Sequence, residues 1–464
     1  MNVLEPWPGG WWHLRDAVDY HLATTFSLLD LAAREKESII YNFCKMNLDA
    51  IEKGKTEPPF AFVVPRHDQH DPITARKMLD ILSRGGVEIH QAEADFWAGN
   101  RQFKRGDYVI LLSQPFRAYV KALLEHKPYP EWTAVLEKAP VPPGDVTGWT
   151  LPLMMGVNCV RIDTPFEVEL GSVNSPRPQR AKVLRRRGGD YLVRHRTNRS
   201  FILLNRLLQE GKKVYWLRDT LELRGSTYAP GTIYIPLKQI DPNKMSFLAQ
   251  ELAVTVEQRA ATARPRDHDA LSETRPLKGF RLKPPRIALY QPWTANVDEG
   301  WTRFLLEQFE FRYQSLYNAR IRKGGLQGDF DAIILPDMPP EEILSGRATP
   351  EPDIYTPRPP KPYLRGVGEE GVKALQEFVR KGGTLIALGS ACDFAIERLG
   401  LPAQDVTKNA SAAEFFCPGS LLRVVVDPTE PLAYGMPDNA AVMFTNGPVL
   451  RPKYWARRTG VPAL

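Results

Sequence analysis

The chain contains few cysteines and no long apolar run. Its cysteines stand far apart, and none belongs to a Cys-x-x-Cys pair: they are Cys44, Cys159, Cys392 and Cys417. This spacing argues against a disulfide framework and favours separate thiols. No stretch approaches the ~18 apolar residues of a membrane span, so we expect no membrane contact.

A signal peptide is not expected either, because Met1 to Gly10 shows no basic region followed by an apolar run. If Met1 is the true start, the protein is expected in the cytoplasm. If the sequence is one product of a split gene or a truncated piece, its parent could be exported.

Nucleotide-binding motifs are missing, whereas positive charge is concentrated. Neither a Gly-x-x-x-x-Gly-Lys-Ser/Thr loop nor a Gly-x-Gly-x-x-Gly turn after a strand occurs. Between Arg177 and Arg199 there are nine Lys or Arg residues against one Asp, and Arg185, Arg186 and Arg187 are consecutive. Such a cluster attracts phosphates. Because no nucleic-acid-binding module accompanies it, a solvated loop and strand face is favoured, with nucleic acid or an acidic partner as the alternative.

The N-terminal part predicts one long helix from His13 to about Lys53, ended by Gly54. Its apolar residues recur at helical spacings and form one stripe: Leu14, Val18, Leu22, Leu29, Ile40, Cys44, Leu48 and Ile51. The aromatic cluster Pro6–Trp12 precedes it and needs a packing partner. We therefore interpret residues 1–57 as the closing helix of a truncated domain.

Residues 58–263 predict an accessory α/β region with two repeats, at about 58–155 and 156–263. Each repeat shows a strand, a helix, a strand and a hairpin, and glycine ends each helix. The matching tails around Gly106–Leu112 and Gly225–Ile235 favour an internal duplication over a chance likeness between glycine-bounded αβ units.

Residues 264–284 are polar and rich in charge, which is typical of a linker. From 285 to 464, strands alternate with helices and predict a doubly wound, mainly parallel sheet. Met338 to Tyr363 contains eight prolines and is expected to be a loop without regular structure.

Few histidines are placed to bind zinc. None begins a His-x-x-Glu pair, and His13 with Asp16 is the nearest approach. The candidate metal ligands are His67, His70 and Asp71, in a loop between a strand and a helix. The alternative is a polar turn in which Asp71 caps the helix that Pro72 begins, and the pattern favours this turn.

A cysteine nucleophile is also unsupported by its surroundings. Glutamine amidotransferase-like domains place cysteine at the centre of Gly-x-Cys-x-Gly, on a sharp turn between strand and helix. Here the turn is Gly389–Asp393, its centre is Ala391, and Cys392 follows one place late. No histidine follows His268 to act as a base for Cys392 or Ser390.

Several strings resemble the C-terminal part of large bacterial zinc carboxypeptidase-like proteins. They cover much of the chain, and the longest is Tyr290–Arg303; the others are Pro6–Trp12, Leu14–Asp16, Gln114–Tyr119, Asp145–Pro152, Phe416–Ser420 and Pro431–Pro437. In that family an N-terminal domain binds zinc and removes C-terminal residues from peptides. The resemblance implies that the zinc ligands and catalytic residues precede the matched segment, and that residues 285–464 form an amidotransferase-like domain lacking its nucleophile.

Three functions follow as hypotheses. The first is a non-catalytic accessory region whose partner is an upstream zinc carboxypeptidase domain, with no cofactor in this chain and zinc only in the missing domain. The second is a stand-alone binding protein for a peptide, a glycan or an acidic ligand. The third is an enzyme of unrecognised chemistry that uses the His67–Asp71 loop or Cys392. No residue of this chain is assigned a catalytic role.

Overall fold

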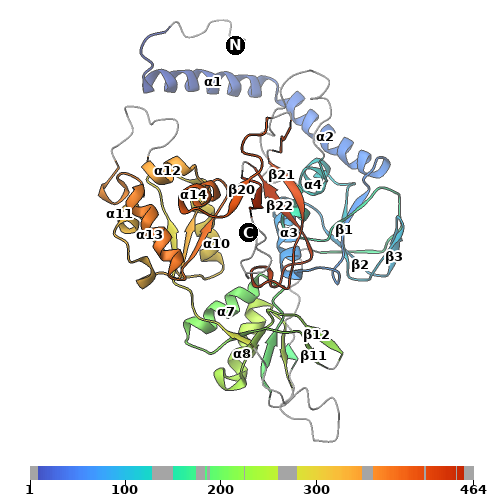
Figure 1. Cartoon of the computed structure of the whole chain (residues 1–464). Coiled ribbons are helices and arrows are strands. Elements are labelled where there is room, and N and C mark those ends of the chain that lie inside the picture. The colour runs from blue at the N-terminus through green and yellow to red at the C-terminus, as the bar shows by residue number, and fades with distance from the viewer. Residues whose placement is uncertain are drawn as a thin grey trace, which may run out of the picture. The chain divides into compact units, whose positions relative to one another are not determined.

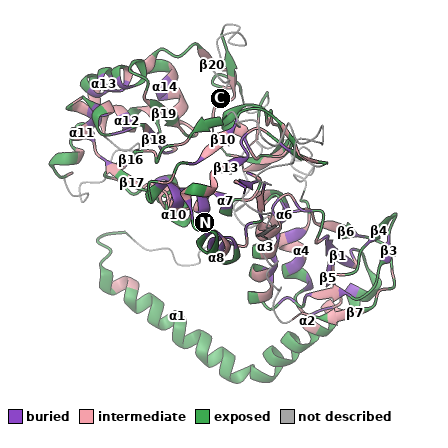
Figure 2. Ribbon diagram, turned by 90° about the horizontal axis from the view of Figure 1, so that it is seen from below, coloured by how far each residue is buried: buried purple, intermediate pink, exposed green. Residues whose placement is uncertain are grey.

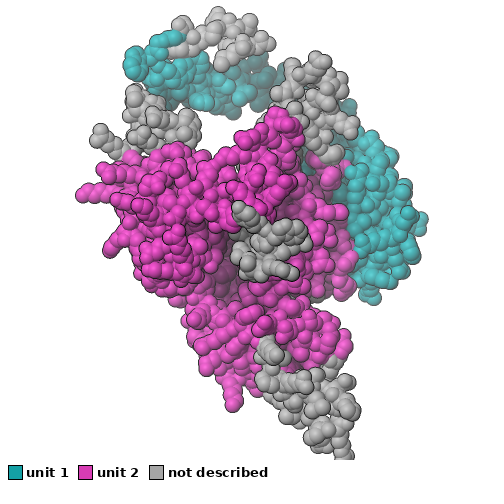
Figure 3. All heavy atoms as spheres, viewed as in Figure 1, with its two compact units in different colours: residues 1–63, 82–122, 160–174 teal, residues 64–81, 123–159, 175–464 magenta. Residues whose placement is uncertain are grey.

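A computed structural model describes most of the chain as two compact units (Figure 3). The described residues are 9–127, 150–173, 183–184, 189–223, 225–259, 279–346, 359–411, 414–417, 419–445 and 447–453. Residues 264–278 of the expected linker and the arginines at 185–187 lie outside these ranges. Within them, no helix has both the length and the apolar character needed to cross a membrane.

Unit 1, which contains residues 1–63, 82–122 and 160–174, begins with two helices where one was expected. They are α1 (Leu14–Arg34) and α2 (Lys36–Thr56). Glu35 separates them with φ −100° and ψ 17°, although its N–H still donates to the Leu31 carbonyl. The departure from helical geometry is therefore confined to one residue, where neither proline nor glycine stands.

The apolar stripe of α1 and α2 lies mostly in solvent. No described residue of α1 is buried, and Figure 2 draws this helix green or pink throughout. Leu22, Leu29 and Ile40 are 45%, 60% and 62% exposed. Only the last turns of α2 are packed, where Gly54 is buried.

The sequence pattern predicted that Gly54 ends the helix, and this prediction is wrong. α2 continues to Thr56, and Gly54 instead lies against the main chain that follows strand β5 (Tyr108–Leu111). A Cβ at Gly54 would be 2.0 Å from the Leu112 carbonyl oxygen. Glycine is thus required for close packing of helix and sheet rather than for a left-handed cap.

The sheet of unit 1 has the order β6-β1-β5-β2-β7. Its remaining strands are β1 (Ala61–Val64), β2 (His90–Ala92), β6 (Val160–Ile162) and β7 (Leu170–Ser172). A separate hairpin, β3 (Phe96–Ala98) with β4 (Arg101–Phe103), lies between β2 and β5 in the chain and contributes Phe96 and Phe103 to the core. Tyr108–Leu111 therefore belongs to the main sheet and not to the hairpin that was predicted.

The same order of elements recurs in unit 2. The first copy has the order β1, α3 (Pro72–Arg84), β2, the hairpin β3–β4 and β5. The second copy has the matching order β9 (Tyr191–Val193), α7 (Arg199–Gln209), β10 (Tyr215–Leu217), the hairpin β11 (Leu221–Leu223) and β12 (Ser226–Tyr228), and β13 (Ile233–Ile235). Their sheet has the order β15-β10-β13-β9-β14-β8, completed by β8 (Val183–Leu184), β14 (Val256–Gln258) and β15 (Gly279–Arg281). In both sheets the strand after the hairpin lies between the two strands that flank the helix. Helix α8 (Pro242–Leu252) packs with α7 around a core that contains Leu207 and Met245.

The expected mixed α/β class with a parallel sheet is confirmed. Four parallel strands have the order β17-β16-β18-β19: β16 (Ile287–Tyr290), β17 (Tyr313–Leu316), β18 (Ala332–Leu335) and β19 (Thr384–Ala387). Helices α10 (Val297–Gln308) and α13 (Gly368–Arg380) belong to the expected alternation of strands and helices. The short helices α11 (Asn318–Arg322) and α14 (Ala391–Leu399) complete this part (Figure 1).

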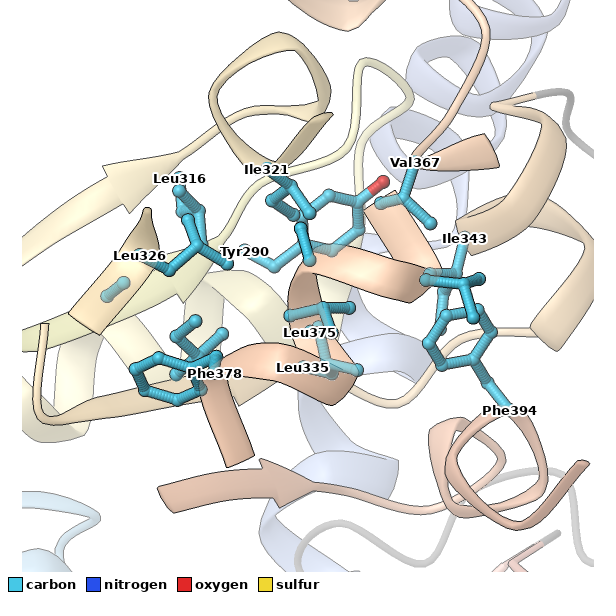
Figure 4. Close-up of a cluster of buried hydrophobic side chains, with 14 of the residues drawn as sticks. Tyr290, Leu316, Ile321, Leu326, Leu335, Ile343, Val367, Leu375, Phe378 and Phe394 are labelled. Carbon is cyan, nitrogen blue, oxygen red and sulfur yellow. The ribbon is translucent and has the colours of Figure 1, made fainter. Parts of the chain in front are cut away.

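Both faces of strand β16 are buried, which explains its uninterrupted apolar sequence. Ala288 and Tyr290 belong to a cluster with Leu375 and Phe378 of α13, drawn in Figure 4. Ile287 and Leu289 belong to a second cluster, against which Leu306 of α10 packs. Helices on both faces of a parallel sheet define a doubly wound arrangement.

Two other expectations for this region need correction. The proline-rich segment contains a helix, α12 (Pro340–Ser345), because Pro340 stands at the first helical position, where its missing N–H costs nothing. After α14 the strands are antiparallel, as β20 (Ala403–Asp405) with β23 (Leu450–Pro452) and β21 (Ser420–Val425) with β22 (Asn439–Phe444). The doubly wound pattern therefore does not extend to residue 464.

We predict that Gly54→Ala lowers the free energy of unfolding by about 1–3 kcal/mol, because the added methyl group overlaps the Leu112 carbonyl. The matched control is Gly300→Ala in α10, where a Cβ would meet no atom within 4 Å. That change should stabilise by about 0.5–1 kcal/mol, since alanine loses less backbone entropy in a helix. Chemical denaturation of both variants tests the pair, and an equal response would disprove the close packing at Gly54.

Candidate functional site

The loop that carries the candidate metal ligands is occupied by structural hydrogen bonds. Asp71 Oδ1 accepts from the backbone N–H groups of Ile73 and Thr74 at the start of α3, at 2.9 and 3.2 Å. Asp71 Oδ2 accepts from the N–H of Asn198 at 2.9 Å. The carboxylate therefore caps one helix and anchors the segment that leads into another.

Neighbouring side chains of this loop join further segments of unit 2. The Gln69 side chain is buried, and its amide donates to the carbonyl of Asn158 at 2.8 Å while its oxygen accepts from the Asn158 N–H. His70 Nε2 lies 2.8 Å from the Gly435 carbonyl, and Arg196 donates to the His70 carbonyl. We call residues 65–71 with these partners the polar junction.

A metal site is not assembled around the polar junction. His67 is exposed, whereas His70 and Asp71 point their polar atoms at backbone groups. Throughout the described ranges, no three side chains of His, Cys, Asp or Glu gather closely enough to hold one ion.

His195 is buried beside the polar junction among aromatic rings. Its ring centroid lies 4.6 Å from that of Phe201 and 5.4 Å from that of Trp216, and Trp216 in turn contacts Tyr434. Neither ring nitrogen makes a hydrogen bond of normal geometry with a described residue. Burial lowers the pKa of His195 to about 4, and a polar contact with the Gly231 backbone opposes part of that shift.

The turn after β19 does not present a nucleophile. Gly389 has φ +51°, and Ala391 is the fully buried first residue of α14 rather than an exposed residue on a strained turn. The Cys392 thiol lies 3.2 Å from the Ala387 carbonyl, to which it donates. Burial, followed by the negative charges of Asp393 and Asp337, raises the Cys392 pKa, so this position disfavours the reactive thiolate.

The carboxyl ends of parallel strands are where doubly wound sheets usually bind ligands. At the carboxyl end of β16, the described residues leave little space. The cavity beside Tyr290 and Asn318 has a volume of about 10 Å³, which holds no more than a water molecule. Trp293, Tyr317 and Tyr363 pack over it, with the Tyr363 ring 5.3 Å from Trp293 and 4.9 Å from Tyr317.

A much larger groove lies at the opposite, amino end of the parallel sheet. Its volume is about 830 Å³, within the size range of ligand-binding pockets. One wall is the last turn of α7, from Asn205 to Gln209. The other wall comprises residues 284–287, 310–315 and 329–330, which surround the starts of β16, β17 and β18.

Direct hydrogen bonds hold the two walls of the groove together. Arg206 of α7 donates from two nitrogens to both carboxylate oxygens of Glu310, at 2.8–3.2 Å. Asn205 donates to the Phe309 carbonyl and Gln209 to the Glu310 carbonyl, each at 2.8 Å. Bidentate arginine–carboxylate pairs fix geometry as well as adding energy, so this wall-to-wall contact is well defined.

The groove carries more positive than negative charge. Arg286, Arg303 and Arg312 line it, against Glu310 and Asp329. Four of these five groups are paired with residues that do not line the groove: Glu310 with Arg206, Asp329 with Arg320, Arg286 with Asp331 and Arg303 with Glu299. Arg312 is the lining cation that has no ion pair with a described residue, so a negatively charged ligand would meet one available positive charge.

Comparison with known proteins gives no assignment: no protein-family model, curated protein or solved structure matches this chain. The family resemblance of individual strings therefore stays an expectation from the residues themselves. The candidate site is the groove, selected by its volume, charge and lining.

Sequence reasoning missed the groove. Its two walls are about a hundred positions apart in the chain, and strand β17 was not predicted. One signal was present, since a strand is expected between α10 and β18 when strands alternate with helices. The four residues of β17, Tyr-Gln-Ser-Leu, are too few and too polar to stand out.

We predict that His195→Phe reduces the loss of stability between pH 6.5 and 4. In the unfolded chain a histidine titrates near pH 6.5, whereas His195 in the folded protein titrates near 4, so the unfolded state binds the extra proton in this window. Acidification should therefore cost the wild type up to roughly 3 kcal/mol that the variant does not lose. Unfolding temperatures between pH 4 and 7 measure this difference in stability. The control is His67→Gln, which replaces an exposed histidine and should keep the wild-type profile.

Thiol reactivity tests whether Cys392 could act as a nucleophile. Cys44 is exposed, whereas burial raises the pKa of Cys392 and raises that of Cys159 to about 12. We expect iodoacetamide at pH 7.5 to modify Cys44 first and the other two much more slowly. Peptide mapping by mass spectrometry gives the order, and preferential alkylation of Cys392 would restore it as a candidate nucleophile.

Proposed function

We propose that this chain is a non-catalytic accessory region of a zinc carboxypeptidase-like protein, and that α1 and α2 bind the polypeptide that carries the zinc site. The supporting observation is the exposed apolar stripe of these helices. Phe26, at 66% exposed, extends the stripe formed by Leu22 and Leu29. Contiguous apolar surface of this kind is typical of protein-binding sites.

Helical geometry places these side chains on one face. Leu22, Phe26 and Leu29 follow at spacings of four and three, which keeps them within about 60° of one another around α1. Trp11 and Trp12, just before the helix, are 79% and 48% exposed. Tryptophan is enriched among the residues that dominate binding energy at interfaces, so the two extend the proposed binding surface.

The identity proposed for the partner rests on the resemblance of the strings around Trp11 and Leu14 to the end of a carboxypeptidase domain. In this proposal zinc and the hydrolytic residues belong to the partner. The final parallel sheet, with a glycine-started turn at Gly389, supports an amidotransferase-like origin used as a scaffold. The buried Ala391 and the half-buried Cys392 are consistent with a scaffold role for that turn.

A second role is favoured by the groove. Its volume and its excess of arginine suit an acidic ligand, in keeping with a protein that binds a peptide, a glycan or another anion. This role needs no catalytic group and is compatible with the first.

We predict that Leu22→Glu and Leu29→Glu each weaken binding to the zinc domain encoded immediately upstream by about tenfold or more, because each places a charge in an apolar contact. Ala23→Glu is the matched control, because residue 23 is exposed and lies about 100° around α1 from Leu22, with Asp19 and Ser27 as its neighbours four residues away in each direction. Isothermal titration calorimetry measures the affinities. All three side chains lie on an exposed helix, so unfolding temperatures should not change.

Two results would contradict the accessory role. One is an upstream reading frame that encodes no His-x-x-Glu domain. The other is binding that Leu22→Glu and Ala23→Glu weaken equally, which would show that the apolar stripe is not the contact.

A further inference from the structure

Strand β17 has one edge without a strand partner among the described residues, and three of its four residues line the groove. In the four-stranded sheet β17 is an outer strand and pairs only with β16. The N–H of Gln291 donates to the carbonyl of Leu316, so Leu316 and Gln314 direct their backbone groups toward β16. Because alternate residues of a strand bond to opposite sides, Tyr313 and Ser315 direct theirs away from the sheet.

The outward backbone groups make no hydrogen bond with another backbone group of the described residues. Tyr313, Gln314 and Ser315 all line the groove. Unpaired strand edges are templates for another strand, and proteins usually block them with proline, a bulge or a covering element. Among the described residues no strand covers this edge of β17, and the groove that its residues line has a volume of about 830 Å³.

The side chains beside the edge are held in place by α10. Arg303 donates to the Tyr313 hydroxyl at 3.0 Å and to the Ser315 hydroxyl at 3.1 Å, and it is also paired with Glu299. This network fixes the two residues whose main chain faces outward. A rigid edge binds a strand at lower entropic cost than a mobile one.

The charge around the edge is positive and partly unpaired. Arg312, immediately before β17, is exposed and has no ion pair with a described residue. Arg286, at the start of β16, is held by Asp331 through two nitrogens. Apolar residues of the same groove, including Pro284, Pro285 and Phe311, supply contact surface between these charges.

We propose that the groove binds an extended acidic peptide segment, which adds to the sheet as a strand along the free edge of β17. The proposal rests on the second role given above and names its ligand. Outward groups at Tyr313 and Ser315 repeat every two residues, which matches the spacing of N–H and C=O groups in an extended peptide. A glycan has no such repeat, and acidic side chains complement Arg312.

The test uses the full chain and a fluorescent hexapeptide of alternating glutamate and valine. Fluorescence anisotropy should show saturable binding. Ser315→Pro removes the outward N–H but no bond to β16, and it should weaken binding about tenfold or more. Ser315→Ala keeps the N–H and should bind within about twofold of wild type.

Two further binding experiments distinguish the contribution of strand pairing from that of charge. A hexapeptide N-methylated at alternate amides cannot form the ladder and should bind about tenfold more weakly or not at all, which tests the proposal even if Ser315→Pro fails to fold. Arg312→Gln should weaken binding and reduce its salt dependence, whereas Lys373→Gln, an exposed cation on α13, should not.

Equal binding of the methylated and unmethylated peptides overturns strand addition but leaves a groove for acidic ligands. Equal binding of a glutamine–valine hexapeptide overturns the role of charge. If neither the acidic hexapeptide nor an anionic oligosaccharide binds, the second role fails together with this inference.

Discussion

The arrangement of unit 2 depends on a constraint at the polar junction: buried polar groups must find partners. Gln69 and Asp71 are both buried, and each bonds both to near neighbours and to main-chain groups of one residue distant in the sequence, Asn158 for Gln69 and Asn198 for Asp71. An unsatisfied amide or carboxylate at these positions would cost several kcal/mol. The loop therefore fixes the relation between α3, the start of α7 and the segment around Gly435, and its polar composition suits this task.

Gly435 shows how closely these segments approach. A Cβ there would lie 1.5 Å from the His195 carbonyl oxygen, and its φ of +85° already favours glycine. The sequence string Pro431–Pro437 thus has a packing explanation that does not involve catalysis. The aromatic rings of Trp216 and Tyr434 complete the same contact.

Sequence patterns predicted the elements whose signals are local. Strand β16 is a short apolar run buried on both faces, and α10 and α13 have apolar residues at helical spacing with clear ends. Gly54 was misinterpreted because a glycine that ends a helix and one that permits close packing look the same in a sequence. The four residues of β17 carry no strong pattern and depend on β16 for their structure.

Candidate sites were harder to predict than helices and strands, because a site can depend on contacts between distant parts of the sequence. The His67–Asp71 loop was correctly interpreted as a polar turn with Asp71 as the helix cap, since capping depends on near neighbours. The groove depends on α7 meeting residues 310–315, and no local pattern reports that encounter. Cys392 was predictable in part. The sequence shows that it stands one place after the centre of the turn, and the structure adds that its thiol donates to the Ala387 carbonyl.

The Arg206–Glu310 pair gives the groove a thermodynamic property of its own. Because these two residues join the walls that a ligand would touch, closing the contact and filling the groove are linked equilibria. A ligand that touches both walls raises the free energy needed to separate them by an amount set by its concentration relative to its dissociation constant. Bound ligand would then stabilise the contact between α7 and the parallel sheet, and its concentration would set the size of this stabilisation.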